Sequence, residues 1–138
     1  MTNNKYYDGA LKLYNKVKIA FIGSNSSDGY PEIKAILIAD RKPGMKEVII
    51  KTNTSSKHVA QLREDSRGCL YFLSLIDFKG VMLKGKYEVV EDAEMKRKYW
   101  NKGDEKYYSK GDSDYCLLVF TPEVGRYYHR FDSGDFEI

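Results

Sequence analysis

The chain is poor in the residues that most often bind metals or act as nucleophiles. Its 138 residues include two histidines and two cysteines, and no histidine, cysteine and acidic residues cluster at metal-ligand spacing. Neither the G-x-G-x-x-G pattern nor the P-loop pattern of nucleotide-binding proteins occurs. An enzyme that lacks its own acid, base and metal tends to take its chemistry from a cofactor.

Long apolar runs and a strong charge imbalance are also missing. No apolar segment is long enough to span a bilayer, and the N-terminus lacks the apolar part of a signal peptide, so we expect a cytoplasmic protein with no membrane partner. The net charge is +3, with basic and acidic residues interleaved, which argues against a nucleic-acid partner. Cys69 and Cys116 stand in apolar segments, so we expect reduced core thiols rather than a disulfide.

Aromatic residues, by contrast, are abundant. They make up 14% of the chain and include twelve tyrosines, which suit a ligand site, a subunit interface or half-buried strand positions. Charged residues are 31% and hydrophobic residues 42%, as is usual for a globular protein. This length suffices for one domain with a substantial core, and we expect a single domain over residues 1–138.

The hydrophobic pattern predicts a mainly β fold with a few helices. We expect strands over Val17–Gly23, Glu32–Ala39, Lys46–Thr52, Gly68–Leu75, Val81–Val90, Tyr115–Thr121 and Gly125–Phe131. We expect helices from about Asp8 to Lys16, Ser55 to Asp65 and Ala93 to Asn101, and a polar loop over Lys102–Asp114. Hairpin-length spacing favours a closed antiparallel barrel over a parallel sheet, and closure also removes exposed sheet edges.

The strand over Lys46–Thr52 runs directly into the helix over Ser55–Asp65, and this junction gathers hydroxyl groups and a cation. Thr52, Ser56 and Lys57 stand at the transition. The first N–H groups of a helix have no partner inside it, and the positive end of its dipole favours a phosphate. The junction therefore predicts an anion site for a phosphorylated small molecule.

Two lysines are the main candidates for this anion site. A lysine is unfavourable in the first turn of a helix, and a bound phosphate would remove the conflict at Lys57. In the alternative interpretation, Ser55 or Thr54 caps the helix and Lys57 is solvated. Lys34 interrupts an apolar strand and is a second candidate, although it also fits the solvent-facing side of an alternating strand.

Other aromatic and acidic residues carry weaker expectations. Of Tyr127 and Tyr128 in the last predicted strand, one should face inward, where its ring can stack on a flat heterocycle. Trp100 ends a helical pattern and is expected to anchor that helix on the barrel. Asp112 and Asp114 flank a turn and are expected to be solvated.

Taken together, these segments resemble the flavin mononucleotide (FMN)-binding split-barrel family, which includes pyridoxamine 5′-phosphate oxidases and short general-stress-protein-like members. The resemblance covers nearly the whole chain and rests on the order and spacing of its parts. These parts are Gly29–Pro31, Lys51–Lys57, Val81–Lys86, Val89–Asp92, the helix that ends at Trp100, and Leu117–Pro122.

The resemblance implies a homodimer of antiparallel split barrels, each with six to seven strands and peripheral helices, and two FMN sites at the subunit interface. Lys34 takes the place of the basic residue that binds the flavin phosphate. The backbone of Ile36 and Leu37 is expected to lie along the isoalloxazine ring. The residues that would complete the phosphate grip are Thr52, Ser56 and Lys57.

The chain also departs from the oxidases of this family. It has Ala39 where they carry a second basic residue, Gly80 where they carry a glutamine, and Tyr127 where they carry a tryptophan. Their substrate-binding arginine/histidine segment would lie beyond Ile138. We therefore expect a flavin-dependent oxidoreductase that acts on an unknown small molecule, and not pyridoxamine 5′-phosphate oxidase activity itself.

Two other functions fit the same barrel. One is a non-catalytic module that binds flavin or haem, or senses stress, with His58 or His129 as the available imidazole ligand for iron. The other is an oligonucleotide-binding barrel, which the tyrosines suit and the balanced charge does not.

Overall fold

Strands with alternating apolar residues build the frame of the molecule. The computed structural model describes residues 5–108 and 113–138. Its strands are β1 (Ile19–Asn25), β2 (Pro31–Arg41), β3 (Val48–Thr52), β4 (Arg67–Ser74), β5 (Lys79–Val90), β6 (Cys116–His129) and β7 (Asp132–Glu137). Its helices are α1 (Lys5–Lys16), α2 (Lys57–Glu64) and α3 (Ala93–Tyr99), and short 3₁₀ turns are η1 (Pro43–Met45) and η2 (Asp104–Lys106).

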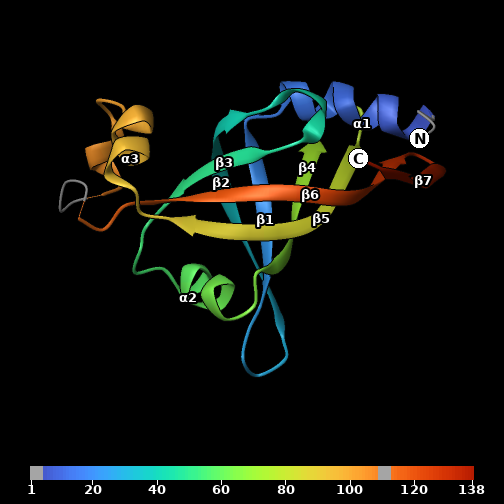
Figure 1. Cartoon of the computed structure of the whole chain (residues 1–138). Helices are drawn as coiled ribbons and strands as arrows, with labels where there is room; N and C mark the ends of the chain where they lie inside the picture. Colours follow the sequence, from blue (N-terminus) through green and yellow to red (C-terminus); the bar gives the residue numbers. More distant parts are fainter. Residues whose placement is uncertain (1–4, 109–112) are drawn as a thin grey trace.

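All strand pairings are antiparallel, and the sheet closes on itself. The strand order is β3-β2-β1-β4-β5-β6-β7, and a further pairing of β3 with β6 turns the first six strands into a barrel (Figure 1). The predicted mainly β barrel is therefore confirmed. β7 lies outside the barrel and pairs only with the second half of β6.

The core fills the inside of this barrel. β5 shows the pattern most clearly, because Val81, Leu83 and Tyr87 are buried while Lys84 and Lys86 are exposed. Large side chains that are completely or almost completely buried come from most of the other strands and from α1; they include Tyr14, Ile22, Ile50, Leu70, Phe72 and Phe120. Both cysteines are unpaired as expected, with Cys116 buried and Cys69 half-buried.

The last third of the chain differs from the prediction. The segments expected as two strands, Tyr115–Thr121 and Gly125–Phe131, form the single strand β6. Pro122 falls between the residues of β6 that pair with β3 and those that pair with β7. Proline has no N–H to donate, but neither β3 nor β7 pairs with β6 at Pro122. No hydrogen bond to either strand is therefore lost there, and β6 continues through this residue.

Helices cover the open parts of the barrel. In Figure 1, α1 lies across one end, α2 lies at the opposite side below β3 and β6, and α3 projects beside the barrel. α1 is helical already from Lys5, so Asp8 lies within the helix and does not cap it as expected. Within the described residues, no helix is both long and apolar enough to cross a membrane.

Candidate functional site

The connection between β3 and α2 is held by an aspartate from a distant part of the chain. The Ser55 backbone N–H donates to Asp114 Oδ1 (2.8 Å), and Ser55 Oγ donates to Asp114 Oδ2 (2.7 Å). Asn53 Nδ2 donates to the Asp114 carbonyl oxygen (3.3 Å). The expectation of a solvated Asp114 is therefore wrong, because its carboxylate fixes the shape of the connection; Asp112 lies outside the described residues.

The first turn of α2 begins without a side-chain cap. The N-cap residue is Ser56, rather than Ser55 or Thr54, and its side chain makes no capping hydrogen bond to a helix N–H. The Ser56 hydroxyl donates instead to the Asn53 carbonyl oxygen (2.7 Å). The N-cap side chain therefore leaves the first N–H groups of α2 to other acceptors, and water or a bound anion can take that place.

His58 links the two hydroxyl groups at this junction. Its Nε2 atom lies 2.7 Å from Thr52 Oγ1 and 3.3 Å from Ser56 Oγ. Burial of the imidazole, and then the positive charge of Lys34, lower the pKa of His58 below its usual value. The neutral ring is therefore favoured at neutral pH. Thr52, Ser56 and Lys34 thus all lie close to one imidazole.

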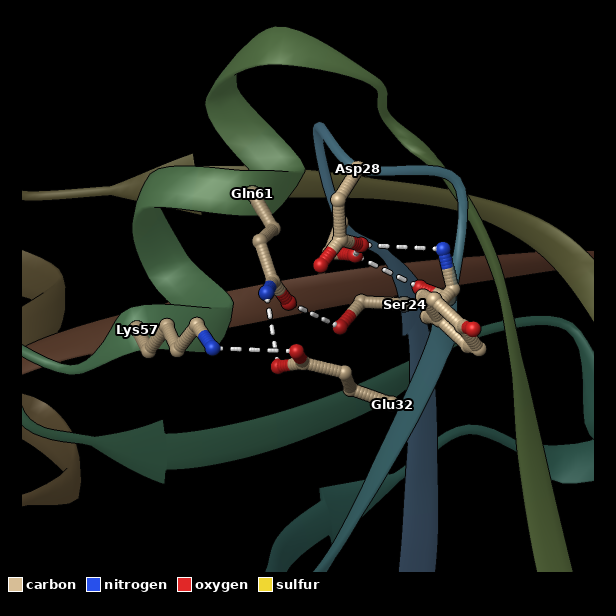
Figure 2. Close-up of polar contacts among 7 residues, drawn as sticks. Ser24, Asp28, Glu32, Lys57 and Gln61 are labelled. Carbon is tan, nitrogen blue, oxygen red and sulfur yellow. Dashed lines mark hydrogen bonds and ion pairs between the residues drawn. The ribbon is translucent and has the colours of Figure 1, made fainter.

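A small hollow of about 200 Å³ lies beside the first turn of α2, and we call it the α2 hollow. Its lining includes Lys34, Glu32, Lys57, His58, Gln61 and Ser24. Figure 2 shows the hydrogen-bonded chain on its wall: Lys57 Nζ lies 3.0 Å from Glu32 Oε2, and Gln61 Nε2 donates to Glu32 Oε1 (2.8 Å). Ser24 Oγ in turn donates to Gln61 Oε1 (2.6 Å), which joins β1, β2 and α2.

The charges in the α2 hollow partly cancel. Hydrogen bonds from Gln61 and Lys57 lower the pKa of Glu32, and the Glu32 carboxylate raises the pKa of Lys57. Both groups are therefore ionised at neutral pH. The unfavourable position of Lys57 in the first turn is thus relieved by Glu32, which the sequence interpretation did not consider.

A larger hollow of about 440 Å³ lies between β2 and the turn η2, and we call it the β2–η2 hollow. Its lining includes Lys34, Ile36, Leu37, Ala39, Thr52, Asn53 and Tyr107. Lys34 also lines the α2 hollow, so this one side chain borders both spaces. Four predicted residues, Lys34, Ile36, Leu37 and Thr52, therefore line one hollow, while Lys57 lines the α2 hollow and Ser56 lies beside His58.

Tyr127 lies elsewhere in the chain. Its ring is buried and packs against Gly9 of α1, and it lines a third hollow of about 560 Å³, together with His129. Tyr127 is the inward-facing residue of the predicted pair, since Tyr128 is 40% exposed. Within one chain, Tyr127 and the residues of the β2–η2 hollow therefore line different spaces.

Trp100 has the structural role that we expected. Its ring contacts Tyr115 and Tyr108, with ring centroids 5.1 and 5.8 Å apart, and this cluster attaches the end of α3 to the barrel. Among the residues that the structure describes, no three histidine, cysteine or acidic side chains are grouped so as to hold a metal ion.

Sequence reasoning missed the acidic residues of the site. Asp114, Glu32 and Asp104 each contact a residue of the segment from 51 to 57, although they lie 25 to 59 residues away along the chain. Each is an ordinary charged residue in a polar or strand segment, and no local pattern distinguishes it. Only the folded chain brings these carboxylates to the junction, from β2, from η2 and from the turn before β6.

Comparison with known proteins shows which proteins this chain resembles. A family model described as pyridoxamine 5′-phosphate oxidase matches residues 8–129. A solved structure from Clostridium acetobutylicum, of a protein related to general stress protein 26 of B. subtilis in the pyridoxinephosphate oxidase family, is 36% identical with a TM-score of 0.87. The match covers 99% of this chain and 97% of that chain. No curated protein matches the chain.

Two more distant structures share the fold. A heme binding protein from Mycobacterium smegmatis is 15% identical with a TM-score of 0.77, and the match covers 99% of this chain and 60% of that one. A pyridoxamine 5′-phosphate oxidase-related, FMN binding protein from Nostoc punctiforme is 11% identical with a TM-score of 0.62, and the match covers 95% and 93% of the two chains. At these identities the likeness is one of fold alone.

Proposed function

Because this chain belongs to the pyridoxamine 5′-phosphate oxidase family, we propose that it binds FMN across the α2 hollow and the β2–η2 hollow. The observation that carries the proposal is the position of Lys34, whose side chain borders both spaces. The phosphate would bind in the α2 hollow, at the uncapped first turn of α2. The ring would bind in the larger hollow against β2.

The donors at the phosphate end suit a dianion. Lys34 borders the α2 hollow and supplies a positive charge, and the first turn of α2 supplies backbone N–H groups. The hydroxyl groups of Thr52 and Ser56 lie beside His58, which lines the same hollow. His58 lies within hydrogen-bonding distance of both hydroxyl groups and orients them. Lys57 stands at the rim, where a phosphate would compete with Glu32 for its ammonium group.

The ring end of the proposed site is mostly apolar. Ile36, Leu37, Ile38 and Ala39 form one wall of the β2–η2 hollow, and Tyr107 lies on its lining from the η2 side. An apolar slot with a few polar groups is the usual environment of a flat cofactor. Bound FMN would supply two-electron redox chemistry, and these residues would position the ring and shield it from water. On this basis we propose a flavin-dependent oxidoreductase that acts on a small molecule.

A homodimer would complete the site. The outer surface of β1 and β2 exposes large apolar side chains, with Ile33 76%, Leu37 54% and Ile19 53% exposed. An apolar surface of this kind is typical of a protein–protein contact. Tyr127 is 9% exposed and lines a separate hollow in its own chain, so the proposed site does not include it.

Haem is the less well supported ligand. The Nε2 atom of His58 is engaged by Thr52 at 2.7 Å, and the residue is 6% exposed, so it offers no open coordination position in this conformation. His129 lies in the hollow that contains Tyr127, away from Lys34. We therefore keep haem as an outcome of the binding test.

The direct test is a titration of the purified protein with FMN, followed by visible absorbance and flavin fluorescence. We expect binding with a Kd below tens of micromolar, and at least tenfold weaker binding by Lys34→Gln, since a hydrogen bond between charged groups contributes about 1.5–3 kcal/mol. Lys86→Gln, an exposed lysine of β5, is the matched control. Absence of FMN binding, or haem binding that is lost in His129→Ala, would overturn the proposal.

A further inference from the structure

A partly buried ion pair lies in the wall of the β2–η2 hollow. Lys51 Nζ is 2.8 Å from Asp104 Oδ2, and the two side chains are 12% and 14% exposed. Every other ion pair of the described residues has at least one side chain that is 50% exposed or more. This pair is therefore the least exposed ion pair of the described residues.

Stability alone does not explain an ion pair with so little exposure to water. Removal of both charges from water costs free energy that their attraction often only offsets, and apolar residues of similar size are frequently as stable in such a place. Lys51 and Asp104 both line the hollow, together with Leu37 and Tyr107. Their charges therefore border the space where a ligand would bind.

The pair is fixed on its acidic side. Asp104 begins the turn η2, and its Oδ2 atom also accepts the Asn101 backbone N–H (2.8 Å). A second contact, from Asn53 Nδ2 to the Tyr107 carbonyl oxygen (3.2 Å), joins the same segment to the end of β3. An ammonium group has three N–H donors. Among the described residues, Lys51 uses one of them on a side chain, so donors remain for a ligand.

Lys51 and Lys34 border different parts of the hollow. Ile38 of β2 pairs with Ile50 of β3, so Lys51 lies beside Leu37. Leu37 is three residues from Lys34, or about 10 Å along an extended strand. Lys34 is close to the first turn of α2, whereas Lys51 is close to η2.

We propose that Lys51, positioned by Asp104, is a second cation of the cofactor site and acts on the flavin ring, while Lys34 acts on the phosphate. This inference rests on the FMN proposal above. Reduction of a flavin by two electrons and one proton leaves a negative charge on the ring, and a nearby ammonium group stabilises that charge whereas a carboxylate opposes it. Lys51 therefore raises the reduction potential of the bound flavin, and Asp104 lowers it.

Two flavins separate the roles of the two lysines, because riboflavin has the ring of FMN and lacks its phosphate. We expect Lys34→Gln to weaken FMN binding and leave riboflavin binding unchanged. We expect Lys51→Gln, which removes the positive charge and keeps a polar side chain, to weaken the binding of both flavins by the same factor, about tenfold. Lys86→Gln on β5 is the control for loss of one lysine charge.

The reduction potential separates an electrostatic role from a structural one. The measurement is a titration of the FMN complex with dithionite in the presence of a reference dye. We expect Lys51→Gln to lower the midpoint potential. The decrease is about 30 mV for each factor of ten by which the substitution weakens the binding of reduced FMN more than that of oxidised FMN. Asp104→Asn should raise the potential, because it removes the opposing charge. A pair that only holds η2 in place would not give shifts of opposite sign.

Two results would overturn this inference while the FMN proposal stands. One is wild-type affinity of Lys51→Gln for riboflavin. The other is a potential that moves in the same direction in both variants, or in neither. If the wild-type protein binds no FMN, the FMN proposal fails first and this inference fails with it.

Discussion

At the scale of single residues, Glu32 controls how much of the Lys57 charge is available to an anion. Its carboxylate accepts hydrogen bonds from Lys57 and Gln61, and Gln61 is itself held by Ser24 on β1 (Figure 2). A cation in the first turn of a helix is unfavourable by itself, and Glu32 removes that penalty. The same carboxylate repels a phosphate at the start of α2.

The first prediction follows from this competition. Glu32→Gln should bind FMN about two- to fivefold more tightly, because its carboxylate no longer repels the phosphate and the interaction between exposed charges is weak in water. The gain should shrink when Lys57→Gln is added, since the released ammonium group carries part of it. Isothermal titration of the two single variants and the double variant measures both effects. An equal gain with and without Lys57 would mean that this lysine does not contact the phosphate.

The second prediction concerns pH and His58. Burial lowers the pKa of His58 in the folded protein below its ordinary value of 6.5, so the unfolded chain binds a proton more readily. The free energy of unfolding should therefore fall as the pH drops below about 6.5, by at most about 1.4 kcal/mol per pH unit from this residue, and show no such dependence at higher pH. Urea unfolding of the wild type and His58→Gln between pH 5 and 8 measures the difference. A wild-type curve parallel to that of the variant would contradict it.

Single residues also show what sequence reasoning can predict about a site. Thr52, Ser56 and Lys57 were found because they are consecutive or nearly so, and the chemistry of a helix start is local. Lys34 was found as a charge within an apolar strand. Asp114 was missed because it acts through contacts with a turn 59 residues away, which depend on the closed barrel.

At the scale of elements, the barrel depends on a close approach between β5 and β6. Gly85 of β5 pairs with Pro122 of β6, next to a shift in register after Lys84. A Cβ atom at Gly85 would lie 2.1 Å from the Thr121 carbonyl oxygen, which is backbone and has little freedom to move. A glycine is therefore required where the two longest strands bend past each other.

The third prediction tests this contact. Gly85→Ala should lower the free energy of unfolding by about 1–3 kcal/mol, because the two strands must separate to admit a methyl group. Gly103→Ala is the matched control, since a Cβ atom there meets nothing within 4 Å. Urea unfolding of both variants gives the comparison, and equal stability of the two would show that the strands are not packed as described.

The elements also show which parts of the fold neighbouring residues predict and which parts depend on contacts distant in the sequence. The hydrophobic pattern predicted the type of nearly every element, because alternation and helical spacing are properties of neighbouring residues. β7 was missed because its sequence, Asp132–Glu137, is polar and has one buried apolar side chain, Phe136. Its order comes from pairing with β6 and from α1, where Lys5 and Tyr6 contact Asp132.

At the scale of the whole molecule, the fourth prediction is that two chains associate through the outer surface of β1 and β2. The wild-type protein should sediment at twice the mass of one 16.0 kDa chain. Ile33→Asp should shift it to the monomer, because a carboxylate in an apolar contact loses its hydration without a partner. Lys86→Asp on β5 should remain dimeric. A wild-type monomer at tens of micromolar, or a dimeric Ile33→Asp variant, would contradict the dimer.

The FMN proposal depends on a phosphate held by the end of β3 and the start of α2. A crystal structure of the protein with FMN locates the phosphorus atom and so shows which residues hold it. We predict phosphate oxygens within hydrogen-bonding distance of Lys34 Nζ, Thr52 Oγ1 and the first backbone N–H groups of α2. A phosphate bound in the hollow of Tyr127 and His129, or α2 with its first turn closed against the protein's own side chains, would contradict the account.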